Sequence, residues 1–125
     1  MKKGRLIHAE LSGLIASLGH GDLIVIGDAG LPVPPGVRCI DLAVTRNLPG
    51  IFDVLDAVLT EMAVERALIA TEAAADLAAR FRERLTADAV PHDEFKRISQ
   101  GARAIIRSGE YTPYANIALF SGVVF

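Results

Sequence analysis

The chain has 125 residues, the usual length of a single domain, and 51% of them are hydrophobic and 22% charged. This balance excludes an intrinsically disordered chain. Thirteen Lys and Arg against fifteen Asp and Glu give a net charge of −2, and only 6% of the residues are aromatic. A nucleic-acid partner is therefore not expected, because the chain encodes neither a basic surface nor a base-stacking platform.

The single cysteine, Cys39, excludes a disulfide framework and a multi-cysteine zinc site, and its apolar neighbours favour a core position. The three histidines show no metal-ligand spacing, so we expect no metal and no cofactor. The longest aliphatic run, residues 23–26, is far shorter than the ~20 residues of a membrane span. Because His8 and Glu10 interrupt the stretch after the basic N-terminus, we expect no signal peptide and a cytoplasmic protein.

The first half of the chain predicts a helix, a strand, a loop, a strand and a helix. Apolar residues spaced three and four apart predict a helix over residues 11–18 that ends at Gly19. A buried strand over 23–26 precedes a loop over 28–36, where three prolines remove backbone donors. A second strand follows over 37–43. The next helix is expected to begin with Pro49 in its first turn and to extend to Met62.

The second half continues the alternation of strands and helices. We expect a buried strand over 67–70, a helix over 72–85, a short strand ending at Val90, a short helix over 93–99, and strands over 104–107 and 117–125. This order predicts an α/β fold: one domain over residues 1–125, built as a three-layer sandwich with a largely parallel central sheet and helices on both faces. Ligands of such sheets bind beyond the carboxyl ends of the strands.

Two candidate site residues lie near the first buried strand. Asp28 directly follows it, where a ligand site is expected, although an Asx turn opening the loop explains the same residue. His20 lies between Gly19 and Gly21 on a tight turn that allows a substrate close approach, or it is a solvated histidine beside a helix cap. Histidine side chains titrate near neutral pH and therefore suit acid–base chemistry.

Further candidates lie in the second half of the chain. His92 and Lys96 are four residues apart at the start of a predicted helix, either as ligand-binding groups or as a solvated cap with a surface lysine. Tyr114, Ala115 and Asn116 precede the last strand and offer a hydroxyl, an amide and backbone groups that suit the hydroxyls of a sugar. Turn formation alone is the alternative. No dinucleotide fingerprint, phosphate loop or hydrolase nucleophile motif occurs.

Seven segments, in order along the chain, resemble the D-ribose pyranase family. They are residues 1–4 (MKKG), 18–20 (LGH), 28–32 (DAGLP), 40–43 (IDLA), 92–96 (HDEFK), 106–110 (IRSGE) and 113–116 (PYAN). The related L-fucose mutarotases share the Gly-His-Gly-Asp turn but lack the loop that begins at Asp28 in this form. The resemblance therefore favours ribose over fucose as the substrate.

The resemblance implies an isomerase that interconverts the pyranose and furanose forms of D-ribose by acid–base catalysis. It implies that His20 is catalytic and that the sugar-binding groups are Asp28, His92, Lys96, Tyr114, Ala115 and Asn116. Asp28 would orient His20, accept a hydrogen bond from a sugar hydroxyl, or act as the partner base. The resemblance also implies a cytoplasmic homo-oligomer, a decamer, with sites at subunit interfaces. The apolar final strand over 117–125 independently favours association, since an exposed strand of this kind needs a cover.

Three alternatives to this function stay open at the level of sequence. A non-catalytic sugar-binding or regulatory module associated with a ribose transporter would use the same pocket without needing a titratable His20. An L-fucose-type mutarotase would use the same turn with another sugar. A general α/β interaction domain would leave the polar groups scattered over the fold.

Overall fold

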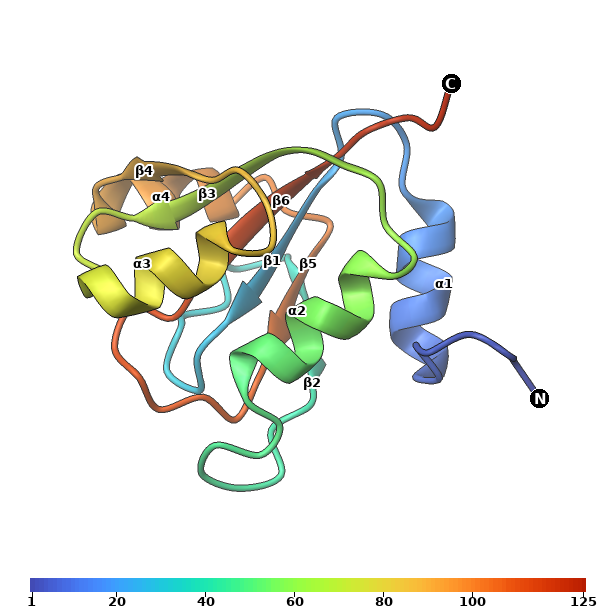
Figure 1. Cartoon of the computed structure of the whole chain (residues 1–125), viewed down its shortest axis with the longest axis horizontal. Helices are drawn as coiled ribbons and strands as arrows, with labels where there is room; N and C mark the ends of the chain where they lie inside the picture. Colours follow the sequence, from blue (N-terminus) through green and yellow to red (C-terminus); the bar gives the residue numbers. More distant parts are fainter.

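A six-stranded sheet of order β2-β5-β1-β6-β3-β4 forms the centre of this computed structural model, which describes residues 1–125. The strands are β1 (Leu23–Gly27), β2 (Arg38–Asp41), β3 (Val64–Ala70), β4 (Asp88–Val90), β5 (Ala104–Arg107) and β6 (Ile117–Ser121). β6 runs antiparallel to its neighbours β1 and β3, whereas the other neighbouring strands are parallel. The carboxyl ends of five strands therefore lie at one edge of the sheet, where β6 begins (Figure 1).

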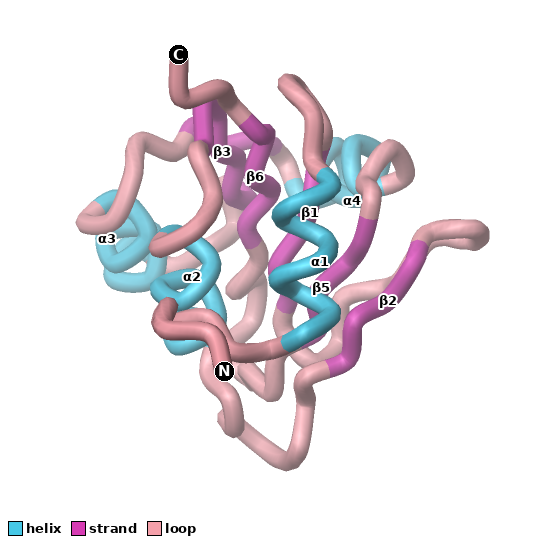
Figure 2. The backbone as a smooth tube through the Cα atoms, turned by 90° about the vertical axis from the view of Figure 1, so that its right-hand side faces the viewer, coloured by secondary structure: helices cyan, strands magenta, loops and turns pink.

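Helices cover both faces of the sheet. α1 (Ala9–Ser17), α2 (Ile51–Leu59) and α3 (Ala75–Arg82) lie on one face and α4 (His92–Ser99) on the other (Figure 2). In β1, Ile24 and Ile26 pack into the core formed with α1, α2 and α3, while Leu23 and Val25 pack with Phe95 of α4. Because strand side chains alternate between faces, only a continuously apolar strand can serve both layers. The expected three-layer sandwich with a largely parallel sheet is confirmed. None of its helices has the length and apolar character that crossing a membrane requires.

Three local expectations are wrong. α2 begins at Ile51 with Gly50 as its N-cap, so Pro49 lies in the preceding loop instead of the first turn. β6 ends at Ser121, and the residues that follow it leave the sheet and become exposed, so the strand expected over 117–125 is too long. Cys39 is exposed rather than buried, because β2 is an edge strand and no helix covers the face on which this side chain lies.

Two loops at the carboxyl edge support each other through backbone contacts. The N–H of Asn47 donates to the carbonyl of Gly109 at 2.6 Å, and the N–H of Gly109 donates to the carbonyl of Pro49 at 2.8 Å. A Cβ on Gly109 would lie 2.6 Å from the carbonyl oxygens of both Thr45 and Leu48. The close approach of the two loops therefore requires glycine at this position.

Substitution of Gly109 by alanine is expected to destabilise the fold by about 1–3 kcal/mol, because the backbone of the facing loop must shift. Gly13, in the middle of α1, is the matched control, since a Cβ there meets nothing within 4 Å. Gly13→Ala should stabilise the protein by up to about 1 kcal/mol, since alanine favours the helix. Denaturant unfolding at one protomer concentration measures both changes, and equal shifts in the two variants would contradict the close approach.

Candidate active site

Asp28 and Asn116 lie side by side, because β1 ends where β6 begins. The N–H of Asp28 donates to Oδ1 of Asn116 at 2.8 Å, and Nδ2 of Asn116 donates to Oδ2 of Asp28 at 3.2 Å. Oδ1 of Asp28 accepts the N–H of Gly30 at 2.9 Å, so the Asx turn considered from the sequence is also present. Gly27 makes room for the pair, since a Cβ there would lie 2.6 Å from a methyl of Leu31 and 3.2 Å from Oδ1 of Asn116.

A cavity of about 360 Å³ opens next to this pair. Its volume lies at the lower end of the range for small-molecule sites. Residues 28–30 form one wall of the cavity and residues 110–113 form the other. A hydrogen bond from the N–H of Ala29 to the carbonyl of Glu110, at 2.9 Å, links the two walls. The residues that line it are Asp28, Ala29, Gly30, Glu110, Tyr111, Thr112 and Pro113. Asp28 and Glu110 contribute carboxylates and Tyr111 and Thr112 contribute hydroxyls, which are donors and acceptors that suit sugar hydroxyls.

The carboxylate of Glu110 organises one wall of the cavity. It accepts the N–H of Ile51 at the start of α2 at 3.0 Å and the hydroxyl of Thr112 at 2.8 Å. Burial by itself would raise the pKa of Glu110, but these bonds and the N–H of Thr112 favour the charged form more strongly. The pKa of Glu110 therefore lies below its ordinary value.

Tyr114 and His92 lie together at the same edge of the sheet. Their ring centroids are 5.1 Å apart and their planes are inclined by 79°, an edge-to-face contact. Tyr114 adopts a φ of 61°, in the left-handed region that few side chains occupy, and its carbonyl accepts the N–H of Asn116 at 2.8 Å. Ala115 is completely buried, so its side chain is not available to a ligand.

The ring of His92 has unused hydrogen-bonding capacity, because its buried Nδ1 has no partner. Its backbone N–H lies 3.0 Å from each carboxylate oxygen of Glu72, which fixes the start of α4. The hydroxyl of Thr71 has the largest effect and lowers the pKa of Glu72; burial opposes it, and the N–H of His92 adds to the lowering, so that the pKa lies below its ordinary value.

Lys96 does not join this group. Its Nζ pairs with Oδ1 of Asp93 at 3.2 Å, three residues earlier on α4. It lines a different hollow, of about 200 Å³, beside residues 31–35 of the proline-rich loop. Exposed ion pairs of this kind are weak, so the lysine is free to exchange partners.

His20 lies at the opposite edge of the sheet from Asp28. It precedes β1 and Asp28 follows it, so the length of the strand, about 16 Å at ~3.3 Å per residue, separates them. Asp28 therefore cannot orient the His20 of its own chain. The expectation that Asp28 orients His20 is wrong within a single protomer. His20 is exposed, and its Nε2 lies 2.7 Å from Oε2 of Glu65 in β3.

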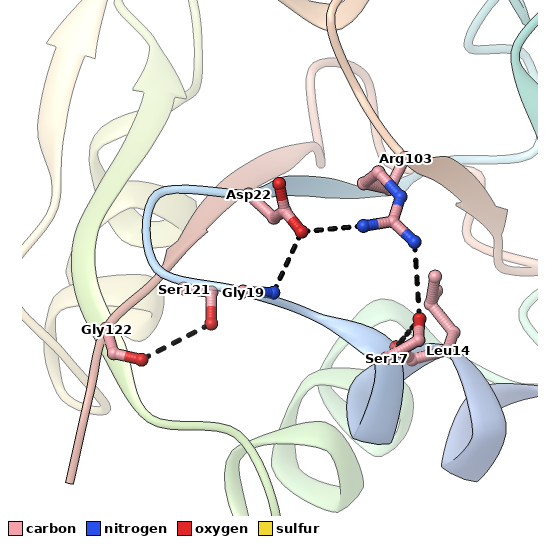
Figure 3. A network of polar contacts seen from close by, with 7 residues as sticks. All are labelled: Leu14, Ser17, Gly19, Asp22, Arg103, Ser121 and Gly122. Atoms are coloured by element: carbon pink, nitrogen blue, oxygen red, sulfur yellow. Dashed lines mark hydrogen bonds and ion pairs between the residues drawn. The ribbon is translucent and has the colours of Figure 1, made fainter.

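The turn that carries His20 is held from several sides (Figure 3). Oδ2 of Asp22 accepts the N–H of Gly19 at 2.8 Å and Nη1 of Arg103 at 2.6 Å. Gly21, with a φ of 82°, donates its N–H to the carbonyl of Ser121 at 2.8 Å. The bond from Gly19 has the largest effect and lowers the pKa of Asp22; burial opposes it, and Arg103 lowers the pKa further, so that it lies below its ordinary value. The exposed imidazole is therefore carried by a well-defined backbone.

The chain is similar to known proteins over its full length. The model of the RbsD / FucU transport protein family matches residues 1–124. The chain belongs to this family. It is 56% identical to the D-ribose pyranase of Paracidovorax citrulli, and the match covers 100% of both chains. RbsD of Bacillus subtilis, whose structure was solved in complex with D-ribose, is 40% identical with a TM-score of 0.94, again over 100% of both chains.

A more distant solved structure shares the fold alone. The fucose mutarotase of Streptococcus pneumoniae, solved in complex with L-fucose, is 24% identical with a TM-score of 0.81 over 100% of both chains. The RbsD / FucU sheet and its helices are therefore retained at low sequence identity.

Three acidic residues at these two edges were missed by sequence reasoning: Glu65, Glu72 and Glu110. Glu110 lies within a segment that carried the family resemblance, and this was the only available signal for it. Glu65 and Glu72 have no such signal, since each meets its partner through a contact between distant segments. His8 is the N-cap of α1, where its Nδ1 accepts the N–H of Leu11 at 3.3 Å.

Glu110→Gln is expected to lower the free energy of unfolding at pH 7 by on the order of 1 kcal/mol, because charged hydrogen-bond acceptors are the stronger ones. Since the pKa of Glu110 is lowered in the folded state, the wild-type advantage is complete above the ordinary carboxyl value of 4.5 and is lost as the pH falls through the lowered value. Denaturant unfolding between pH 7 and pH 3 measures this difference in the free energy of unfolding between the wild type and Glu110→Gln. Glu83→Gln, at an exposed position, is the control, and a difference independent of pH would contradict the assignment.

Proposed function

We propose that this protein is an isomerase that interconverts the pyranose and furanose forms of D-ribose. The observation that carries the proposal is its full-length similarity to RbsD of Bacillus subtilis, the protein solved with D-ribose. The full-length relative from Paracidovorax citrulli, named D-ribose pyranase, supports the same activity. The cavity beside Asp28 and Asn116 adds the polar groups that a monosaccharide needs.

The reaction moves protons without redox change. In ring opening, the anomeric hydroxyl loses its proton, the bond between C1 and the ring oxygen breaks, and that oxygen gains a proton, which leaves an aldehyde at C1. In closure, the hydroxyl on C4 loses its proton and attacks C1, and the aldehyde oxygen gains one. A group that exchanges protons near neutral pH accelerates such steps by about 10²–10⁴-fold. His20 is our candidate for this group, because its ring is exposed on a rigid turn.

The sugar-binding role falls to the opposite edge of the sheet. Asp28 and Tyr114 would bind hydroxyls of the sugar, with the ring of His92 beside them, while Asn116, which is buried, would hold the carboxylate of Asp28 in place. Ala115 contributes through its backbone, since its side chain is buried. Lys96 would have to leave Asp93 to take part.

A complete site therefore needs two copies of the chain. One protomer would supply the sugar-binding edge and a neighbour would supply His20, because β1 holds these groups apart within a protomer. Exposed apolar side chains support association: Ile7, Val44 and Phe125 are 76%, 77% and 100% exposed. Assembly as a decamer and a cytoplasmic location stay predictions.

Two substitutions separate catalysis from binding. His20→Ala should lower the rate of ring exchange at saturating ribose by about 10²–10⁴-fold and leave KM nearly unchanged. Asn116→Ala should raise KM roughly fivefold, because Asp28 loses the amide that holds its carboxylate and a hydrogen bond contributes about 1 kcal/mol. Saturation-transfer NMR on equilibrated D-ribose measures both, with L-fucose expected to exchange more slowly. A wild-type protein that leaves the ribose exchange rate unchanged would overturn the proposed function.

Mixing two inactive variants tests the shared site. Protomers carrying His20→Ala and protomers carrying Asp28→Ala, unfolded together and refolded at equal amounts, should regain activity, because about one quarter of the interfaces then pair two intact edges. Each variant refolded alone is the control. Lack of recovery in mixed oligomers, or a monomer by light scattering in the wild type, would show that the site is not shared between copies.

A further inference from the structure

The pairing of β3 with β6 shifts register at Glu65. Val64 pairs with Ser121 and Arg66 pairs with Phe120, although these two partners are adjacent in β6. Glu65 is therefore the extra residue of a β-bulge. Bulges redirect the side chain of the extra residue and often occur near functional sites. The direction of the Glu65 side chain is therefore set by the bulge and not by the regular alternation of side chains between the two faces of the sheet.

The bulge and the turn before β1 are attached to the same strand end. The N–H of Gly122 donates to the carbonyl of Ala63 at 2.8 Å, while the carbonyl of Ser121 accepts the N–H of Gly21 at 2.8 Å. A Cβ on Gly122 would lie 3.1 Å from the Cβ of Glu65, so a glycine gives the bulge its room. Figure 3 shows Ser121 and Gly122 between the turn and the ribbon of β3.

The resulting contact joins two exposed side chains. Oε2 of Glu65 lies 2.7 Å from Nε2 of His20, with 44% and 61% of the respective side chains exposed. Pairs this exposed contribute little to stability. A carboxylate on one imidazole nitrogen instead decides which nitrogen holds the proton and how the ring is oriented.

We propose that Glu65 is a positioning residue that accepts a hydrogen bond from Nε2–H of His20 and so makes Nδ1 the nitrogen that exchanges protons with the sugar. This inference rests on the proposed function, in which His20 is the acid–base group. The proton of the sugar hydroxyl enters at Nδ1 and leaves again from Nδ1, while Nε2 keeps its proton throughout. The carboxylate stabilises the imidazolium that exists between these two steps.

Steady-state exchange kinetics test this role with three variants of the full-length protein. Glu65→Ala should lower kcat by ten- to a hundredfold, as loss of a supporting carboxylate typically does, with KM within about twofold of wild type. Glu65→Gln should lower kcat less than Glu65→Ala does, because its amide oxygen can accept the same bond but carries no charge to stabilise the imidazolium. Glu83→Ala, which removes an exposed carboxylate from the end of α3, should leave both constants unchanged.

NMR on protein labelled with ¹⁵N-histidine gives a readout that does not depend on activity. In the wild type, His20 should show a direct proton–nitrogen correlation at Nε2 that is missing in Glu65→Ala, with His20→Ala identifying the signal. A Glu65→Ala kcat less than tenfold below wild type, a loss expressed in KM, or a wild-type proton on Nδ1 would overturn the inference. If the wild type fails to accelerate exchange, the proposed function falls, and the NMR result alone decides whether Glu65 orients His20.

Discussion

The antiparallel insertion of β6 between β1 and β3 decides where the polar side chains of this chain meet. Because β6 runs against its neighbours, it begins beside the end of β1, which brings Asn116 to Asp28. It ends beside the start of β1, which ties Ser121 to the turn before that strand. A parallel β6 would exchange these two contacts and separate Asn116 from its carboxylate partner. The strand is also buried on both faces, so its register is strongly fixed.

Carboxylates that accept backbone N–H groups organise the loops at both edges. The carboxylate of Asp28 accepts the N–H of Gly30, that of Glu110 accepts the N–H of the first residue of α2, and that of Asp22 accepts the N–H of Gly19. In Asp22 and Glu110 these bonds outweigh burial, so the pKa is lowered and the charged form persists at neutral pH. The loops are therefore defined by specific bonds, and the site groups they carry need little rearrangement to bind a ligand.

Under the proposed function, the separation of His20 from Asp28 would make association part of the chemistry. A single protomer places the cavity beside Asp28 and the turn that carries His20 at opposite edges of one sheet. In the proposed assembly, a single repeated interface would bring these unlike edges together. The contact between His20 and Glu65 then belongs wholly to one copy, which keeps the orientation of the imidazole independent of how the copies meet.

The sequence by itself determined the layers and the order of the elements, because apolar periodicity and glycine or proline positions are local signals. It also located the segments around His20, Asp28 and Asn116, through the family resemblance. Only the tertiary structure decided that β6 lies in the centre of the sheet, that Cys39 is exposed, and that His20 and Asp28 lie at opposite edges. Strand order, bulges and long-range side-chain pairs depend on contacts between distant segments, which no local pattern encodes.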